Sequence, residues 1–231
     1  MSTSTGCWVR LGRAAAASRS RSGRTPTILL MRERSEWTKI IEEDPEHSQR
    51  YIQKFRDLAA EGFDLGGEAR CIDAMVGRGA RVLDAGCGPG RVGAILFDLG
   101  HDVVGVDGDP ELIAAAGEDH PGPTWLVGDL AELDLPARGI SEPFDVIVCA
   151  GNVMAFLATS TRRVVLEKMR SHLVDGGRLV IGLGAGRGYE FDGFFEDVEA
   201  ANFRVDLRAA SWDLRGFSEE SEFLVAALSP A

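Results

Sequence analysis

Residues 82–93 carry the clearest chemical signal in the chain, with the sequence Val-Leu-Asp-Ala-Gly-Cys-Gly-Pro-Gly-Arg-Val-Gly. A short apolar run ends in the acid Asp84, and Gly86, Gly88 and Gly90 follow at alternate positions. Glycine has no Cβ atom and tolerates positive φ, so such a turn lets the backbone approach a ligand closely. The pattern predicts a ligand-binding turn between a strand and a helix.

Two later acids extend this signal, because each also ends an apolar run. Asp107 follows Gly86 by 21 residues, and a carboxylate there can accept hydrogen bonds from both hydroxyls of a ribose. Asp129, in Gly128-Asp129-Leu130, can accept from an adenine amine while the next backbone N–H serves a ring nitrogen. Together with the glycine turn, these acids predict a cofactor that contains a nucleoside.

The elements that must position these residues alternate along the chain. Expected strands cover residues 81–84, 102–107, 124–127, 144–150 and 178–183, with a turn at 175–177 before the last of them. Expected helices cover residues 46–61, 68–76, 91–99, 160–173 and 194–201, and another starts at Pro110 with Asp109 as its cap. Strands separated by helices imply a parallel sheet with right-handed crossovers.

The end of the chain breaks this alternation. Only a turn separates two extended segments, residues 204–211 and 221–228, and so short a link cannot make a parallel crossover. We therefore predict an α/β fold: a Rossmann-like, doubly wound, seven-stranded sheet, mostly parallel with an antiparallel last strand, and helices on both faces.

Composition is that of an ordinary globular protein, with 231 residues, 45 % of them apolar and 26 % charged. No apolar run approaches the roughly 18 residues of a transmembrane helix, so no membrane association is expected. The four cysteines have no CxxC spacing and no neighbouring histidines. This favours a reduced, cytoplasmic protein with no metal site and no disulfide framework.

The charge is unevenly distributed. Residues 1–32 contain six arginines and no acid, so the overall net charge of −11 becomes −17 for the rest of the chain. A body this acidic is a poor match for nucleic acid. Residues 1–30, rich in Ser, Ala, Gly and Arg, cannot build a core, and three interpretations stay open: a disordered extension, a transit-like segment, or a misassigned start upstream of Met31.

Two cofactor classes fit the glycine turn. Residues 88–93 also satisfy G-x-G-x-x-G, the dinucleotide pattern, with an acid about 20 residues further on. A pyrophosphate, however, is disfavoured by a nearby carboxylate, and Asp84 ends the strand beside the turn. S-adenosylmethionine has no phosphate and carries an ammonium and a sulfonium, so an acid there favours it.

Taken together, residues 82–93, 104–107, 128–130, 144–150 and 173–179 resemble the ordered motifs of the class I S-adenosylmethionine-dependent methyltransferases, over about residues 46–229. The resemblance implies one domain at residues 31–231, with N-terminal lid helices at 36–78 and a Rossmann-like core at 79–231. It implies that the cofactor contacts are Asp84, Gly86, Gly88, Gly90, Asp107, Gly108, Leu112, Asp129, Leu130, Ala150 and Tyr51.

Within that resemblance, Asp84, Gly86 and Gly88 would hold the methionine end, Asp107 the ribose, and Asp129 with Leu130 the adenine. Gly108 departs from the family, which often has an apolar side chain there, so contact with adenine falls to Leu112. Tyr51, with Phe55 on the same expected helix, is a candidate lid contact.

The methyl acceptor is not specified by the sequence. Short intervals between the late strands favour a small molecule, and the candidate contacts are Asn152, Met154, Arg187 and Tyr189. We name no catalytic base, and we expect His101 and His172 at the surface. The alternatives are an NAD(P)-dependent oxidoreductase and a non-catalytic cofactor-binding module that regulates a partner.

Overall fold

The computed structural model describes residues 33–231, and the predictions for residues 1–30 and for a start at Met31 lie outside that range. The strands are β1 (Arg81–Ala85), β2 (Asp102–Asp107), β3 (Thr124–Val127), β4 (Phe144–Cys149), β5 (Leu173–Gly184), β6 (Phe203–Ala209) and β7 (Phe223–Pro230). The helices are α1 (Glu36–Glu43), α2 (His47–Ala60), α3 (Gly67–Asp73), α4 (Arg91–Asp98), α5 (Pro110–Asp119), α6 (Val153–Phe156), α7 (Arg162–Ser171) and α8 (Phe191–Ala200). Three 3₁₀ turns are η1 (Leu130–Glu132), η2 (Pro136–Arg138) and η3 (Thr159–Thr161).

All seven strands form one sheet in the order β3-β2-β1-β4-β5-β7-β6. The pairs among β1 to β5 are parallel, whereas β7 is antiparallel to both β5 and β6. The predicted fold class is confirmed, including the antiparallel last strand. The last two strands are shifted by one to two residues at their ends, and the turn expected at residues 175–177 lies inside β5, where the pairing with β4 jumps from Leu173 to Arg178.

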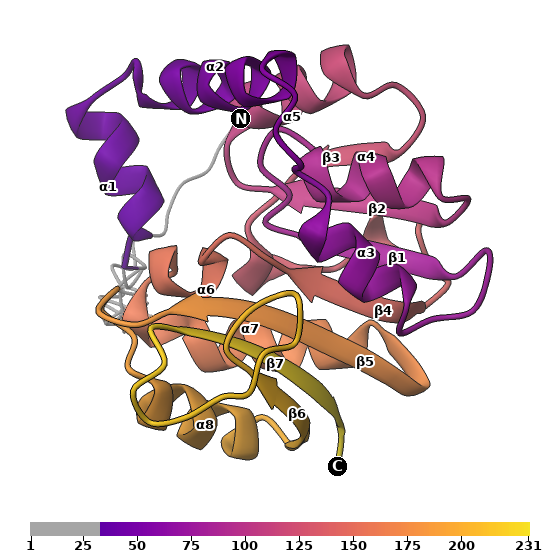
Figure 1. Ribbon diagram of the computed structural model, residues 1–231, viewed down its shortest axis with the longest axis vertical. Helices are drawn as coiled ribbons and strands as arrows, with labels where there is room; N and C mark the ends of the chain where they lie inside the picture. The colour runs from indigo at the N-terminus through magenta and orange to yellow at the C-terminus, as the bar shows by residue number, and fades with distance from the viewer. Residues whose placement is uncertain (1–32) are drawn as a thin grey trace, which may run out of the picture. The chain divides into compact units, whose positions relative to one another are not determined.

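Helices cover both faces of the sheet, and each face has its own core (Figure 1). Alternate strand residues face opposite ways, so Leu83 and Ile147 pack with α7 and α8, while Val82 and Val148 face the side of α3 and α4. Helix α3 was expected among the lid helices, but its Ile72 is fully buried in the second core. Therefore α3 is part of the core layer and not of the expected lid.

The indole of Trp125 in β3 fills the space beneath the glycine turn. A Cβ atom added to Gly105 of β2 would lie 2.3 Å from this ring, and one added to Gly93 or Gly90 would lie 2.9 or 3.0 Å from it. The glycines in this part of the chain therefore let a large ring pack against backbone, in addition to any role toward a ligand.

Two histidines that we expected at the surface are buried. His101 is 3 % exposed, with its Nε2 atom 3.0 Å from the Asp73 carboxylate. His172 is 7 % exposed; its Nε2 accepts from the Leu135 N–H at 3.2 Å, and its Nδ1 lies 2.8 Å from the Lys168 carbonyl. The surface prediction was wrong: both nitrogens of the His172 ring have polar partners, whereas in the described chain His101 has one for Nε2 and none for its buried Nδ1.

In the part of the chain that the structure describes, none of the helices has the length and apolar character needed to cross a bilayer. Cys71, Cys87 and Cys149 are buried free thiols. Residues 33–231 also contain no group of three His, Cys, Asp or Glu side chains arranged to hold a metal ion.

Packing of Trp125 predicts opposite effects for two glycine substitutions. Gly105→Ala puts a methyl group into the indole ring and should lower the free energy of unfolding by about 1–3 kcal/mol. Gly117→Ala, on α5 with no atom within 4 Å of the added methyl, should raise it by about 0.5–1 kcal/mol through helix propensity. Urea denaturation measures both, and equal effects would contradict the packing.

Candidate functional site

The glycine turn after β1 is folded against the end of β2. The backbone N–H groups of Gly86 and Cys87 both donate to the Val106 carbonyl, at 2.8 and 3.1 Å. Gly86 has φ of 78°, and a Cβ atom on it would lie 2.4 Å from the Val153 side chain of α6. Glycine is therefore required here both by backbone conformation and by close packing.

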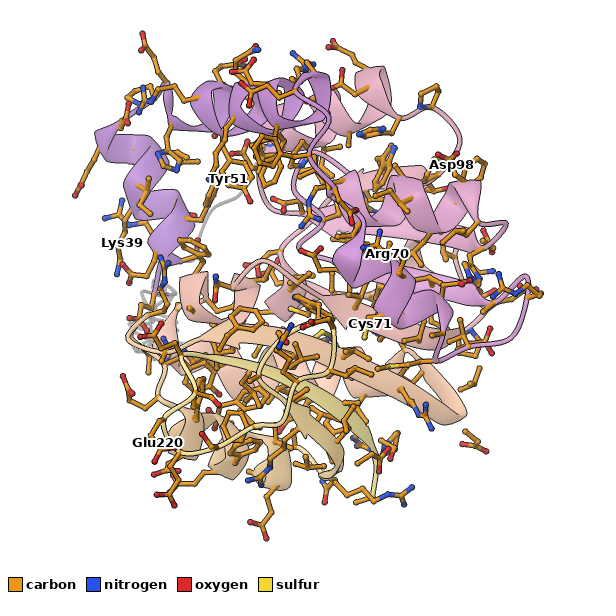
Figure 2. The ribbon with its side chains drawn as sticks, in the orientation of Figure 1. Lys39, Tyr51, Arg70, Cys71, Asp98 and Glu220 are labelled. Atoms are coloured by element: carbon orange, nitrogen blue, oxygen red, sulfur yellow. The ribbon has the colours of Figure 1, made fainter. Side chains whose placement is uncertain are left out.

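Gly88 differs, because an added Cβ atom would meet one neighbour, and at an ordinary contact distance. Its φ is 55°, and the nearest atom to an added Cβ would be Cε1 of Tyr51, at 3.8 Å. Figure 2 shows Tyr51 on the side of α2 that faces the rest of the domain. The turn and α2 thus leave a cradle between Gly88 and Tyr51 that a side chain on Gly88 would fill.

Asp107, at the end of β2, fixes the far side of this cradle. One carboxylate oxygen accepts from the Gly88 N–H and the other from the Asp109 N–H, both at 2.9 Å. Burial raises the pKa of Asp107, while these two N–H groups oppose that shift. The Gly108 N–H also bonds to this carboxylate, and a carboxylate can accept about four hydrogen bonds, so Asp107 keeps capacity for at least one hydroxyl donor of a ligand.

Asp84 lies beneath the turn and is 2 % exposed. It accepts from the Gly93 N–H at 2.9 Å, in the first turn of α4. Burial raises the pKa of the Asp84 carboxyl from its ordinary 3.8 to about 7. A buried acid at this helix start disfavours a phosphate and favours a cationic group nearby.

Asp129 follows β3 and caps η1 by accepting from the Ala131 N–H at 2.9 Å. A pocket of about 150 Å³ adjoins it, lined by Val106, Gly128, Asp129, Glu132, Leu133, Asp134, Leu135 and Arg138. Typical sites for whole small molecules measure about 300–1,000 Å³, so this pocket suits only one part of a nucleoside cofactor. Leu130 is buried beside it in the main core.

Three further predicted cofactor contacts lie along the same strand-end edge. Gly108 is exposed, with the Gly128 carbonyl 4.0 Å from the position of an added Cβ. Leu112 of α5 is 3 % exposed, in a small cluster with Tyr51, and the buried Ala150 directly follows β4. The structure therefore gathers the predicted cofactor residues from the ends of β1, β2, β3 and β4 and from α2 and α5 at one edge of the sheet.

The predicted acceptor contacts are not all brought to that edge. Met154 is fully buried, and Tyr189 is 4 % exposed and donates its hydroxyl to Asp197 at 2.6 Å, so both belong to the main core. Asn152, with φ of 65°, accepts from the Gly184 N–H at 2.6 Å and ties the loop after β4 to the end of β5. Arg187 is exposed after β5.

Sequence reasoning did not find one ion pair beside the turn. Arg91 donates to Glu68 of α3 at 2.6 Å and to the Leu65 carbonyl at 2.6 Å, and its guanidinium lies over the Phe55 ring of α2. Arg91 directly follows the glycine turn but matches no motif, so the sequence held no signal for this contact. The pair joins the turn to α2 and α3.

This sheet order, with a glycine turn after β1 and an acid at the end of β2, is that of the Rossmann-like proteins, a class that holds nucleoside cofactors at its strand ends. A sequence profile described as "Methyltransferase domain" matches residues 82–177. A TehB-like SAM-dependent methyltransferase from Corynebacterium glutamicum is 49 % identical, with a TM-score of 0.76 over 81 % of this chain and 100 % of that one. The chain belongs to the class I S-adenosylmethionine-dependent methyltransferase family, as the motifs predicted.

Curated relatives are more distant. The magnesium-protoporphyrin O-methyltransferase of Rhodobacter capsulatus is 34 % identical over 124 residues, which is 50 % of this chain and 52 % of the relative. The trans-aconitate 2-methyltransferase of Azoarcus sp. is 35 % identical over 104 residues, 44 % of this chain and 38 % of the relative. The chain thus spans about half the length, or less, of these curated relatives.

Burial of Asp84 predicts a pH-dependent stability difference for Asp84→Asn. Between about pH 4 and 7 the folded protein keeps a proton that the unfolded chain releases, so the stabilising contribution of this carboxyl is lost as the pH rises through 7. The asparagine side chain does not titrate, so the variant does not lose stability in this way. Relative to wild type it should gain on the order of 3 kcal/mol between pH 5 and 8.

Urea denaturation at the two pH values measures this gain. Asp98→Asn, at an exposed acid at the end of α4 (Figure 2), is the control and should change little between them. A stability difference for Asp84→Asn that does not vary with pH would contradict the buried, proton-retaining carboxyl.

Proposed function

We propose that this chain binds S-adenosylmethionine across the ends of β1, β2 and β3 and transfers its methyl group to a small-molecule acceptor. One observation carries the proposal: the open cradle at Gly88, bounded by the Asp107 carboxylate and the Tyr51 ring. A nucleoside ligand needs hydroxyl acceptors beside backbone that it can approach closely, and this edge offers both.

Each part of the cofactor has a matching group in the proposal. Asp107 would accept from the ribose hydroxyls, and Asp129 with the adjoining pocket would hold the adenine. The methionine end would lie along Gly86 and Gly88, above the buried Asp84, whose negative form is favoured by a nearby ammonium or sulfonium.

Methyl transfer requires the site mainly to position the acceptor against the methyl group. When bound, S-adenosylmethionine supplies a methyl group on a sulfonium and a neutral thioether as leaving group. The chain's residues would orient the acceptor for in-line attack and keep water out, which can supply much of the acceleration. Tyr51 and its neighbour Trp37, whose ring centroids are 5.4 Å apart, would form that cover. We assign no catalytic base.

An NAD(P)-dependent oxidoreductase is the weaker alternative. The strand order of dinucleotide-binding sheets is 3-2-1-4-5-6, whereas here the antiparallel β7 is inserted between β5 and β6. The buried Asp84 would also lie close to a pyrophosphate bound at the start of α4. Both observations favour the sulfonium cofactor.

Short connections at the acceptor side support a small acceptor. Only residues 150–152 separate β4 from α6, and residues 185–190 separate β5 from α8, so this edge carries no inserted domain in the described chain. The curated relatives are named for a tetrapyrrole and a tricarboxylate, so acceptor chemistry does not follow from family membership. Cytoplasmic location and absence of nucleic-acid binding stay predictions.

Calorimetric titration tests the cofactor. S-adenosylmethionine and its demethylated product should bind with micromolar affinity, and NADH should not bind. Tight NADH binding would overturn the proposal. Cofactor binding without turnover across a broad acceptor panel would leave the non-catalytic module as the better interpretation.

Gly88→Ala tests the cradle directly. The added methyl fills the space facing Tyr51, so cofactor affinity should fall at least tenfold, about 1.4 kcal/mol. Gly100→Ala is the matched control: its φ of 93° imposes comparable backbone strain, but no atom lies within 4 Å of the added methyl. If both variants bind the cofactor equally well in calorimetry, the cradle is not the binding site.

A further inference from the structure

Asp109, two residues after the predicted ribose acid, is a buried junction between the lid and the core. It is 2 % exposed. One carboxylate oxygen caps α5 by accepting from the Glu111 N–H at 2.9 Å. The other accepts from Trp37 Nε1 of α1 at 2.9 Å and from Ser48 Oγ of α2 at 2.5 Å. Within the described chain, these three neutral donors are its side-chain partners.

Capping explains only one of the two oxygens. An aspartate at a helix start needs a single oxygen for its cap, and here the second oxygen is committed to both lid helices. A carboxylate removed from water is costly unless donors surround it, so the loss of Trp37 or Ser48 would leave a poorly satisfied charge. The junction therefore favours one position of α1 and α2.

Trp37 connects Asp109 to residues on the other side of the site. Its indole is held at Asp109 beyond β2, and its ring meets the Phe156 ring of α6, beyond β4, with centroids 5.6 Å apart. It also packs edge-on against Tyr51, which faces the cradle at Gly88. In Figure 1, α2 lies beside α5 and α1 leads from there toward α6. Trp37 thus bridges the loops on both sides of the glycine turn.

We propose that Asp109 is a positioning residue that holds Trp37 and α2 closed over the bound cofactor. The inference rests on the proposed function. The link to the cofactor is short, because the Asp109 N–H is donated to Asp107, the residue proposed to accept from the ribose. Breaking the Trp37–Asp109 bond should loosen the lid, and cofactor should then leave faster.

Two variants break this bond from opposite ends. Trp37→Phe keeps an aromatic ring against Tyr51 and Phe156 but removes the indole N–H. Asp109→Asn keeps a residue that caps helices well, but its single amide oxygen cannot serve both the cap and the lid donors. Gln49→Ala is the matched control, since Gln49 joins the same α2 to α5 through an exposed bond to Glu111.

The first readout is the dissociation rate of S-adenosylhomocysteine, measured by stopped-flow chase on the full chain. Trp37→Phe and Asp109→Asn should each raise it about tenfold, and the double variant should add little to Asp109→Asn, because that change already removes the bond to Trp37. Gln49→Ala should match wild type. In steady-state kinetics, both variants should change the KM for cofactor more than they change kcat.

The second readout needs no cofactor. Amide hydrogen exchange in residues 36–60 should become faster in both variants and stay unchanged in Gln49→Ala. Unchanged exchange and unchanged dissociation in both variants would overturn the inference, and so would a lower global stability with an unaltered dissociation rate. If wild type does not bind S-adenosylhomocysteine, the proposed function fails, and the exchange data still decide whether Asp109 anchors the lid.

Discussion

The two hydrogen bonds accepted by the Asp107 carboxylate connect the rest of the site. One holds the Gly88 N–H and so fixes the glycine turn after β1, and the other holds the Asp109 N–H and so fixes the start of α5. Because β1 and β2 are parallel neighbours, their ends arrive side by side and one acid can serve both loops. The glycine turn, Asp107 and Asp109 therefore meet at one place in the fold.

Stability and ligand approach place opposing demands on this edge. Glycines at positive φ and the buried Asp84, whose pKa is raised to about 7, each cost stability in the free protein. The packing of Trp125 against Gly90, Gly93 and Gly105 offsets part of that cost by burying a large ring on bare backbone. The turn is thus supported from below, and its upper side stays open at Gly88.

The sequence predicted the order of the strands along the chain and most of the helices between them, and it predicted where β2 and β3 end. These predictions succeeded because a Gly or Asp directly after an apolar run marks the end of a strand in a parallel sheet. Asp107 and Asp129 could therefore be placed from the alternating pattern of the strands alone. The antiparallel β7 followed from the length of one connection.

Side-chain direction after a strand end was much less predictable. Asn152, in the loop after β4, and Met154, in α6, are two residues apart, yet Met154 is fully buried and Asn152 bonds to Gly184. The apolar residues of so short a segment show no helical or strand periodicity, so tertiary contacts decide which side chains are buried. The same holds for His101 and for Trp37, whose partners Asp73 and Asp109 are 28 and 72 residues away in sequence.

This contrast separates the two halves of the site. Residues proposed for the cofactor come from β1, β2 and β3, where backbone geometry fixes their positions and the family motif can be read directly. The residues predicted to contact the acceptor, Asn152 and Tyr189, use their polar groups on Gly184 and Asp197, and the proposed cover comes from α1 and α2. The proposed lid is held by only a few side-chain bonds, and the loops below it bond to one another. Substitutions in the lid can therefore alter which acceptor is bound without disturbing the residues proposed for the cofactor. Acceptor specificity in this chain should therefore depend on residues such as Trp37 and Phe156, which no motif marks.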